Sequence, residues 1–533
     1  MRNTEDINKL PVELLDEIFE YACAESPAID FLPYPVTLSL VCRRWRFIIL
    51  GTPERPRCNP RHWRRLEASL KWRSFPEDPD PLVEMVTKYI SLSERPNPIP
   101  LRVVLKNGAV YGSDDDHVEM LEKYPNDLPS QENIIDTLLP VISRLETVKL
   151  HMPFGFLERD MPNPLPQRPL LRSFSLTITN RHSFPSHGNL GFLGIIADAP
   201  ELTELSFSSW SRDFTQIPDS LSIPWNQLTK LELRMVGAGT VSNLQDILKR
   251  AVNLETAKLT VDGWGSSPPL NVDDDPFPLT RLRTLQLEFH NECCDRVFLK
   301  PFAFPRLEAF TLIYDKHSYG YIDVGEILIG MVKRTRSRCG SPSFPLSTLK
   351  LKFDHGGLES SALFDFMRDV DTLVHLECPC LPEMSTFLEP LTIRAKEPVL
   401  GANLLVLQVF VVDFDEEKLK CVLDFLTSRG WFSEANKGNA TAGRLEKFTL
   451  VLNQDILDKD LERSEEWKRL SAYQDSPQSP FEFCSGKWPG PYQKPLPLRR
   501  QDTSLCSLMS RMEKSINSGL TPASSRFSSF DTF

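Results

Sequence analysis

From residue 145 onward, one pattern of apolar and polar positions recurs along the chain. Each occurrence is a six-residue phrase with leucine or another apolar residue at the first, fourth and sixth positions and mostly polar residues between them. The eleven phrases begin at Leu145, Leu171, Leu202, Leu228, Leu254, Leu282, Leu307, Leu346, Leu373, Leu404 and Leu445. Six of the ten gaps between successive starts are 25 to 28 residues long, which predicts a repeat array with loops inserted before Leu346 and Leu445.

Each phrase is predicted to form a strand, and helical apolar spacing precedes many of the phrases, as in "NLQDILKRA" and "EKLKCVLDFL". Strands and helices that alternate at this period resemble the leucine-rich repeat. The asparagine or cysteine that this family carries three residues after the last leucine is mostly missing here. The resemblance therefore implies a degenerate, irregular solenoid: a curved parallel sheet with outer helices.

Strand alternation also predicts which side chains line the open, concave face of this sheet. Successive residues of a strand point to opposite faces, so the third, fifth and seventh positions of each phrase share one face. Lysine and arginine outnumber glutamate there by seven to four. The basic residues are Lys149, Lys230, Arg234, Lys258, Lys350, Lys352 and Lys447. The surplus fits two interpretations: a docking surface for an acidic or phosphorylated protein segment, or an ordinary solvated sheet face.

The N-terminal region shows helical spacing instead. Apolar residues at Leu14, Leu15, Ile18, Phe19 and Ala22 predict one helix that begins near Pro11 and stops before Pro27. A second predicted helix has its apolar side at Leu38, Val41, Cys42, Trp45, Ile48 and Ile49. Three arginines at positions 43, 44 and 46 lie on its other face. Trp45 is therefore predicted to pack against apolar groups, not to stack on nucleic-acid bases.

These motifs together resemble an F-box. They are "LPVELLDEIF" at Leu10–Phe19, "LVCRRWR" at Leu40–Arg46, then Thr52-Pro53 and "HWRRL" ending at Leu66. The loops between them are longer than in short animal F-boxes and resemble those of mushroom-forming fungi. The motifs cover roughly a tenth of the chain.

The resemblance implies a Skp-type adaptor as partner and, through it, a cullin scaffold. A three-helix unit of this size buries little of its own surface, which also favours a partner. The residues that we expect to face the adaptor or to support that surface are Leu10, Pro11, Leu14, Ile18, Val41, Cys42 and Trp45. The sequence leaves open which of them face outward, and it leaves open that they form only the core of a small helical domain.

Composition narrows the classes of function. The formal net charge is −11 and the pI about 5.5, which argues against nucleic acid as a partner. No apolar run is long enough to span a membrane and no secretory segment is evident, so we expect no membrane association and a cytoplasmic or nuclear location. Motifs for a nucleophile elbow, a phosphate-binding loop or a zinc helix are missing, so we expect neither enzymatic activity nor a cofactor or metal.

The sequence thus predicts an α/β chain in four parts. Residues 1–70 form a small all-α, three-helix F-box domain, 71–130 a linker region with a helix and a short strand, 131–466 the leucine-rich-repeat solenoid, and 467–533 a Ser/Pro-rich, largely disordered tail. The expected function is that of the substrate-recognition subunit of a Skp–cullin–F-box-type ubiquitin ligase that binds an unknown protein target. The alternative is a non-catalytic interaction scaffold that uses the same parts without ubiquitin transfer.

Overall fold

The structure is a computed structural model, and it divides the chain into two compact units, Met1–Ser485 and Gly486–Phe533. All the residues that it describes belong to the first unit. They are 7, 9–25, 34–50, 60–70, 87, 89–91, 93, 99–107, 138–152, 170–178, 194–197, 199–209, 223–235, 240–261, 276–289, 298–314, 324–340, 343–353, 360–378, 384–392, 400, 403–411, 414–429, 445–452, 464–474 and 481–485. Most of the predicted tail therefore lies outside the described residues.

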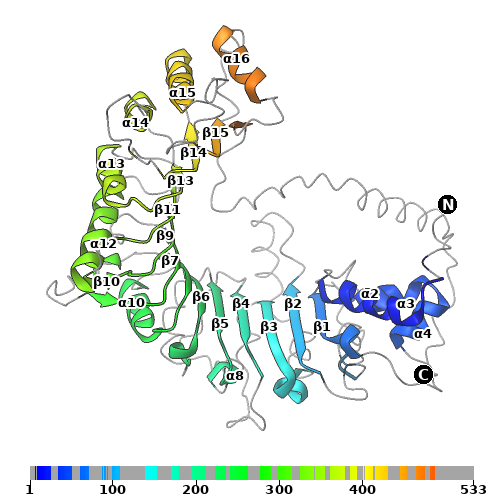
Figure 1. Ribbon diagram of the computed structural model, residues 1–533. Coiled ribbons are helices and arrows are strands. Elements are labelled where there is room, and N and C mark those ends of the chain that lie inside the picture. The colour runs from blue at the N-terminus through cyan, green and yellow to red at the C-terminus, as the bar shows by residue number, and fades with distance from the viewer. Residues whose placement is uncertain are drawn as a thin grey trace, which may run out of the picture. The chain divides into compact units, whose positions relative to one another are not determined.

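A parallel sheet of 14 strands dominates this unit, and its strands lie side by side in chain order (Figure 1). They are β1 (Arg65–Leu70), β2 (Leu101–Asn107), β3 (Leu145–Met152), β4 (Ser173–Ile178), β5 (Glu204–Ser209), β6 (Lys230–Met235), β7 (Thr256–Val261), β9 (Thr284–Phe289), β11 (Ala309–Tyr314), β12 (Thr348–Phe353), β13 (His375–Cys378), β14 (Val406–Val411), β15 (Lys447–Leu452) and β16 (Phe481–Ser485). The short strands β8 (Phe277–Pro278) and β10 (Phe302–Ala303) pair separately. The prediction of an α/β fold with a parallel sheet is confirmed.

Each of the eleven phrases supplies one strand of this sheet. All 33 of their apolar positions are buried, and none is more than 2% exposed. The backbone repeats as well: the carbonyl of the second residue in one phrase accepts hydrogen bonds from the second and third N–H groups of the next. Thr203 O, for example, accepts from Thr229 N at 2.9 Å and from Lys230 N at 3.0 Å. The phrase therefore sets the strand register, whatever the length of the gap before it.

Helices and 3-10 turns connect the strands. They are η3 (Leu139–Arg144), α8 (Gly194–Ala197), η7 (Trp225–Gln227), α10 (Thr240–Arg250), α12 (Val324–Cys339), α13 (Ser360–Asp369), α14 (Met384–Leu391), α15 (Glu416–Ser428) and α16 (Glu465–Gln474). Figure 1 shows α10, α12 and α13 along one side of the strands. Their buried apolar residues join those of the phrases in one continuous core. No helix among the described residues is long and apolar enough to cross a membrane.

Polar side chains tie neighbouring repeats together just before the phrases. Asn253 Nδ2 donates to Asn226 O at 2.6 Å, and Asn403 Nδ2 donates to Asp371 O at 2.7 Å. Gln227 makes the same kind of bond to the preceding turn. These amides lie one residue before the first leucine of a phrase. They satisfy backbone carbonyls in the turn of the preceding repeat.

The sheet is longer than predicted at both ends. β1 and β2 precede residue 131, and β16 follows residue 466, the predicted limits of the repeat region. β1 also lies inside the segment 1–70 that we expected to be entirely helical. β2 buries Leu101, Val103 and Leu105 opposite the apolar positions of β3, but these residues alternate strictly and lack the first step of the phrase, which has two residues between its apolar positions, so the repeat pattern missed them. The sequence did predict a short strand at β2.

Candidate functional site

Helix α2 (Val12–Glu25) carries two neighbouring rows of apolar side chains, and only one row is buried. The buried row consists of Leu15, Phe19 and Cys23. The other row, which we call the exposed stripe, consists of Leu14, Ile18 and Tyr21. Leu14 is 46% exposed and Ile18 is 44% exposed. The helix is thus apolar over a wider arc than its own core covers, since each row alone would suffice for a helix packed on one side.

Two further apolar side chains are exposed on the helices that pack against α2. Val41 ends α3 (Tyr34–Val41), and Phe47 lies on α4 (Arg43–Leu50); each is more than half exposed. Arg44 Nη2 donates to Leu10 O at 2.5 Å and ties α4 to the segment just before α2. Apolar groups are therefore displayed on all three helices of this N-terminal region.

The predicted second helix is broken at Cys42, which is not helical. Arg46 N donates to Cys42 O at 3.0 Å, and Trp45 N lies 3.5 Å from Cys42 Sγ. Cys42 thus caps α4: its carbonyl accepts the first backbone bond of the helix, and its thiol accepts the Trp45 N–H in the first turn. The sequence missed this break because one continuous apolar spacing runs through both helices.

Aromatic and aliphatic groups fill the space between the helices. The rings of Phe19 and Trp45 are 4.8 Å apart at an interplanar angle of 57°. Ile49 is fully buried beside them in the same core cluster. Trp45 therefore holds α4 against α2 from the inside, as its apolar neighbours in the sequence predicted.

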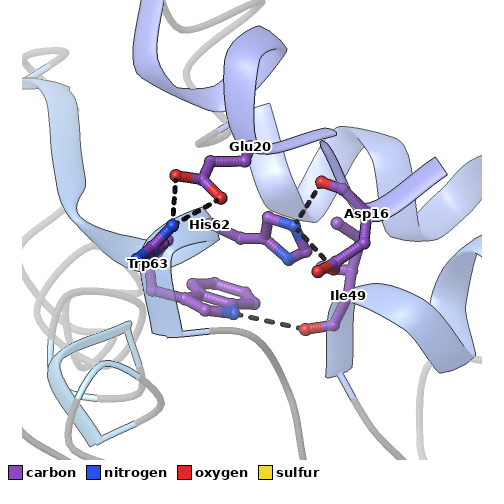
Figure 2. A network of polar contacts seen from close by, with 6 residues as sticks. Asp16, Glu20, Ile49, His62 and Trp63 are labelled. Carbon is purple, nitrogen blue, oxygen red and sulfur yellow. Dashed lines mark hydrogen bonds and ion pairs between the residues drawn. The ribbon is translucent and has the colours of Figure 1, made fainter. Parts of the chain in front are cut away.

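A polar network fastens α2 to the short turn η1 (Pro60–Trp63), as Figure 2 shows. His62 Nε2 lies 3.2 Å from Asp16 O and 3.1 Å from Asp16 Oδ1. Arg61 Nη1 pairs with Glu20 at 3.3 Å, one turn further along α2. Trp63 Nε1 donates to Ile49 O at 3.3 Å. One turn thus holds both α2 and α4.

His62 is fully buried, and burial lowers its pKa below the ordinary value of 6.5. Its hydrogen bond to Asp16 and the negative charges of Asp16 and Glu20 act in the opposite direction. The effect of burial is the larger, so the pKa stays below its ordinary value and the ring is neutral at neutral pH. The Asp16 atoms near Nε2 are both oxygens, which accept hydrogen bonds, so the proton is on Nε2 and is donated to Asp16. Nδ1 is then a buried acceptor without a partner among the described residues.

The same turn leads directly into the sheet. Trp63 packs edge-on against Tyr89, with ring centroids 4.9 Å apart, and the Tyr89 hydroxyl donates to Arg65 O at the start of β1. Arg64 Nη2 pairs with Oε2 of Glu146, a residue of β3, at 2.6 Å. The core of the helices is continuous with the core of the sheet. The helices that carry the exposed stripe are therefore packed against the N-terminal end of the sheet.

The structure separates the seven predicted adaptor-facing residues into two groups, a distinction that the sequence left open. Pro11, Leu14, Ile18 and Val41 are exposed. Trp45 is buried, and Leu10 and Cys42 are partly buried against the core. The first group forms surface, and the second supports it.

Sequence reasoning missed four exposed apolar residues of this region. They are Ile7, Val12, Tyr21 and Phe47. Ile7 and Tyr21 have a signal in the sequence, because Ile7, Pro11, Leu14, Ile18 and Tyr21 follow one another at spacings of three or four residues. Phe47 lies two residues after Trp45, so it points away from the side that Trp45 occupies.

On the sheet, four of the seven predicted basic residues are paired with carboxylates of the sheet itself. Lys350 Nζ lies 2.5 Å from Glu377 Oε1, and Lys447 Nζ lies 2.5 Å from Glu482 Oε2. Lys230 and Arg234 pair with Glu204 and Glu232 at 3.9 and 3.2 Å.

Two of these pairs were predictable. Lys230 and Glu204 are both third residues of adjacent phrases, and Lys350 and Glu377 are both fifth residues. The other three basic residues are Lys149, Lys258 and Lys352.

Burial alone would raise the pKa of Glu377. Hydrogen bonds from His375 and Lys350, together with the charges of Lys350 and Lys352, lower it to about 2. The carboxylate is therefore ionised at neutral pH and acts as a fixed negative charge inside a basic group of side chains.

The described residues contain no cluster of three or more His, Cys, Asp or Glu side chains that could hold a metal ion. No protein-family model matches the chain, and no curated protein matches it. The case for a function therefore depends on the exposed apolar residues of α2, α3 and α4 and on the charges of the sheet.

Proposed function

We propose that the chain is the substrate-recognition subunit of a Skp–cullin–F-box-type ubiquitin ligase. The N-terminal helices dock a Skp-type adaptor, which is bound to a cullin scaffold, and the leucine-rich-repeat sheet holds a protein target. The chain itself performs no chemistry. It promotes ubiquitin transfer by proximity, because holding two reactants together turns an encounter into an effectively unimolecular step.

One observation carries the adaptor part of this proposal. Of the nine large apolar residues that are exposed among the described residues, seven lie at or before Phe47. Isolated exposed apolar residues are common on any surface, but a concentration of them in one small helical region is typical of a protein interface. The region also carries the ordered motifs of an F-box, from Leu10 to Leu66.

The arginines of this region support a protein partner over nucleic acid. Arg44, Arg46, Arg61 and Arg64 all donate hydrogen bonds to groups of the chain itself. Phosphate binding would have to displace those acceptors, and the net charge of −11 opposes it further.

The remaining alternative is a scaffold that binds the adaptor without ubiquitin transfer. Recovery of a cullin and of ubiquitylated target with the full chain distinguishes the two.

The adaptor proposal is tested with the double variant Leu14→Asp/Ile18→Asp of the full chain. Both residues are exposed, so the fold persists. Two charges in the centre of an apolar interface weaken binding to a purified Skp-type adaptor by about thirtyfold or more, measured by co-purification and titration calorimetry. Val252→Asp is the matched control, because Val252 is exposed to a similar degree, at 47%, after helix α10. Unchanged adaptor binding by the double variant, or no binding by the unmodified chain, rules the proposal out.

A further inference from the structure

The open face of β3 to β7 carries uncompensated positive charge at two places. Lys230 pairs with Glu204 on this face, and Arg234 pairs with Glu232. These four charges cancel. Lys149 on β3 and Lys258 on β7 have no ion-pair partner in the part of the chain that the structure describes. Two positive charges therefore remain on a face of a chain whose net charge is −11.

The two lysines are joined by a single row of side chains that runs straight across the sheet. In register, Lys149 lies beside Ser175, Ser175 beside Ser206, Ser206 beside Glu232, and Glu232 beside Lys258. Adjacent strands are about 4.8 Å apart, so the four steps of this row cover about 19 Å. An extended peptide rises about 3.3–3.6 Å per residue, so five or six residues span the distance.

Small hydroxyl side chains occupy the middle of this surface. Ser175, Thr177, Ser206 and Ser208 are partly exposed, and no hydrogen bond of their side-chain hydroxyls is found within the described residues. These short side chains keep the surface low on β4 and β5, between Lys149 and Glu232. Their hydroxyls can donate to the backbone carbonyls of a peptide that crosses the strands.

We propose that this row binds an extended acidic segment of a protein, with carboxylates about five or six residues apart that pair with Lys149 and Lys258. The proposal deepens the target-binding role of the sheet and rests on the proposed function for that role. The other predicted basic positions do not take part, because the sheet's own carboxylates neutralise most of them.

The test uses the full chain and a fluorescein-labelled oligo-glutamate of about eight residues at low ionic strength. The variant Lys149→Ala/Lys258→Ala binds about two- to thirtyfold more weakly, the sum of two exposed ion pairs. The variant Lys249→Ala/Lys468→Ala removes the same net charge from helices α10 and α16, where the two lysines pair with Asp246 and Glu465, so its affinity changes less than twofold. Fluorescence anisotropy measures both.

Three results overturn the proposal: no binding of the oligo-glutamate, equal loss in the two double variants, or equally tight binding of a single-stranded oligonucleotide of the same charge. A second arm compares Gly/Ser peptides that carry two glutamates about five residues apart or about two residues apart, and the wider spacing must bind more tightly. Adaptor binding is measured on the same variants. Adaptor binding without peptide binding defeats this inference alone, and the reverse result defeats only the adaptor proposal.

Discussion

The N-terminal helices and the sheet distribute apolar side chains in opposite ways. In the sheet, every apolar position of the eleven phrases is buried, and the alternate positions are largely polar. In α2, a buried row and the exposed stripe run next to each other. The sheet buries its apolar residues because each repeat packs against the next, whereas α2 buries only one of its two apolar rows. We expect a second polypeptide to bind at the other row, the exposed stripe.

Geometry explains the difference. A strand has two faces, and in a repeat array one face of every strand packs into a core that grows with each added repeat. Three short helices enclose a single small interior, which Phe19 and Trp45 already fill. Further apolar residues on α2 must therefore remain on the surface or meet a partner.

Truncating one side chain in each region is the strongest test of this comparison. Leu231→Ala removes a fully buried phrase residue in β6 and lowers the free energy of unfolding by about 2–5 kcal/mol, because a cavity remains. Leu14→Ala removes a leucine from the exposed stripe and changes that free energy by about 0.5 kcal/mol or less. Urea unfolding of both variants measures the difference. A cost above about 2 kcal/mol for Leu14→Ala would mean that the stripe is already covered within the chain.

The sheet could be predicted from the sequence because its signal is repeated. The spacing from Leu228 to Leu233 fixes one strand, and ten similar phrases fix the pairing and the direction of each side chain. Gaps of unusual length did not disturb this, since the second residue of each phrase carries the connecting backbone bonds.

The helical region was less predictable. Leu14 and Leu15 are identical residues at adjacent positions, and helical spacing alone does not show that Leu15 is buried and Leu14 is 46% exposed. At the break, the Cys42 thiol accepts the backbone N–H of Trp45. The spacing of apolar residues does not predict such a hydrogen bond. His62 gave no signal either, because its partner Asp16 is distant in sequence and lies on a different element.

Charge at the open face of the sheet provides a second test. Glu377→Gln removes the carboxylate that Lys350 and His375 surround. A pKa lowered from 4.5 to about 2 corresponds to a stabilisation on the order of 3 kcal/mol at neutral pH, which the variant loses. In the unmodified chain this contribution is complete above pH 4.5 and is lost as the pH falls toward 2. Acid unfolding followed by circular dichroism checks the window, and an unchanged acid midpoint in the variant would contradict it.

The smallest effect that we predict is a loss of stability of the N-terminal helices when His62 takes up a proton. It distinguishes the helices from the sheet by the pH at which each loses stability. The pKa of His62 is lowered by burial, so the unfolded chain takes up a proton at higher pH than the folded chain does. The stability contributed by the neutral ring is therefore complete above pH 6.5 and is lost as the pH falls through the lower folded value. That window begins at a higher pH than the one in which Glu377 titrates. The helices should consequently loosen before the sheet does.

Hydrogen exchange detects this order, because the amides of α2 and of β6 can be followed in the same sample and corrected for the intrinsic effect of pH. In the unmodified chain, protection of α2 falls relative to β6 as the pH is lowered below 6.5. His62→Gln keeps an amide donor toward Asp16 but cannot take up a proton, so in this variant the ratio stays constant. His151→Gln, on the open face of β3, is the control for the loss of a histidine elsewhere. If α2 and β6 lose protection together in the unmodified chain, the continuous core between them transmits the protonation of His62, and the helices cannot loosen independently of the sheet.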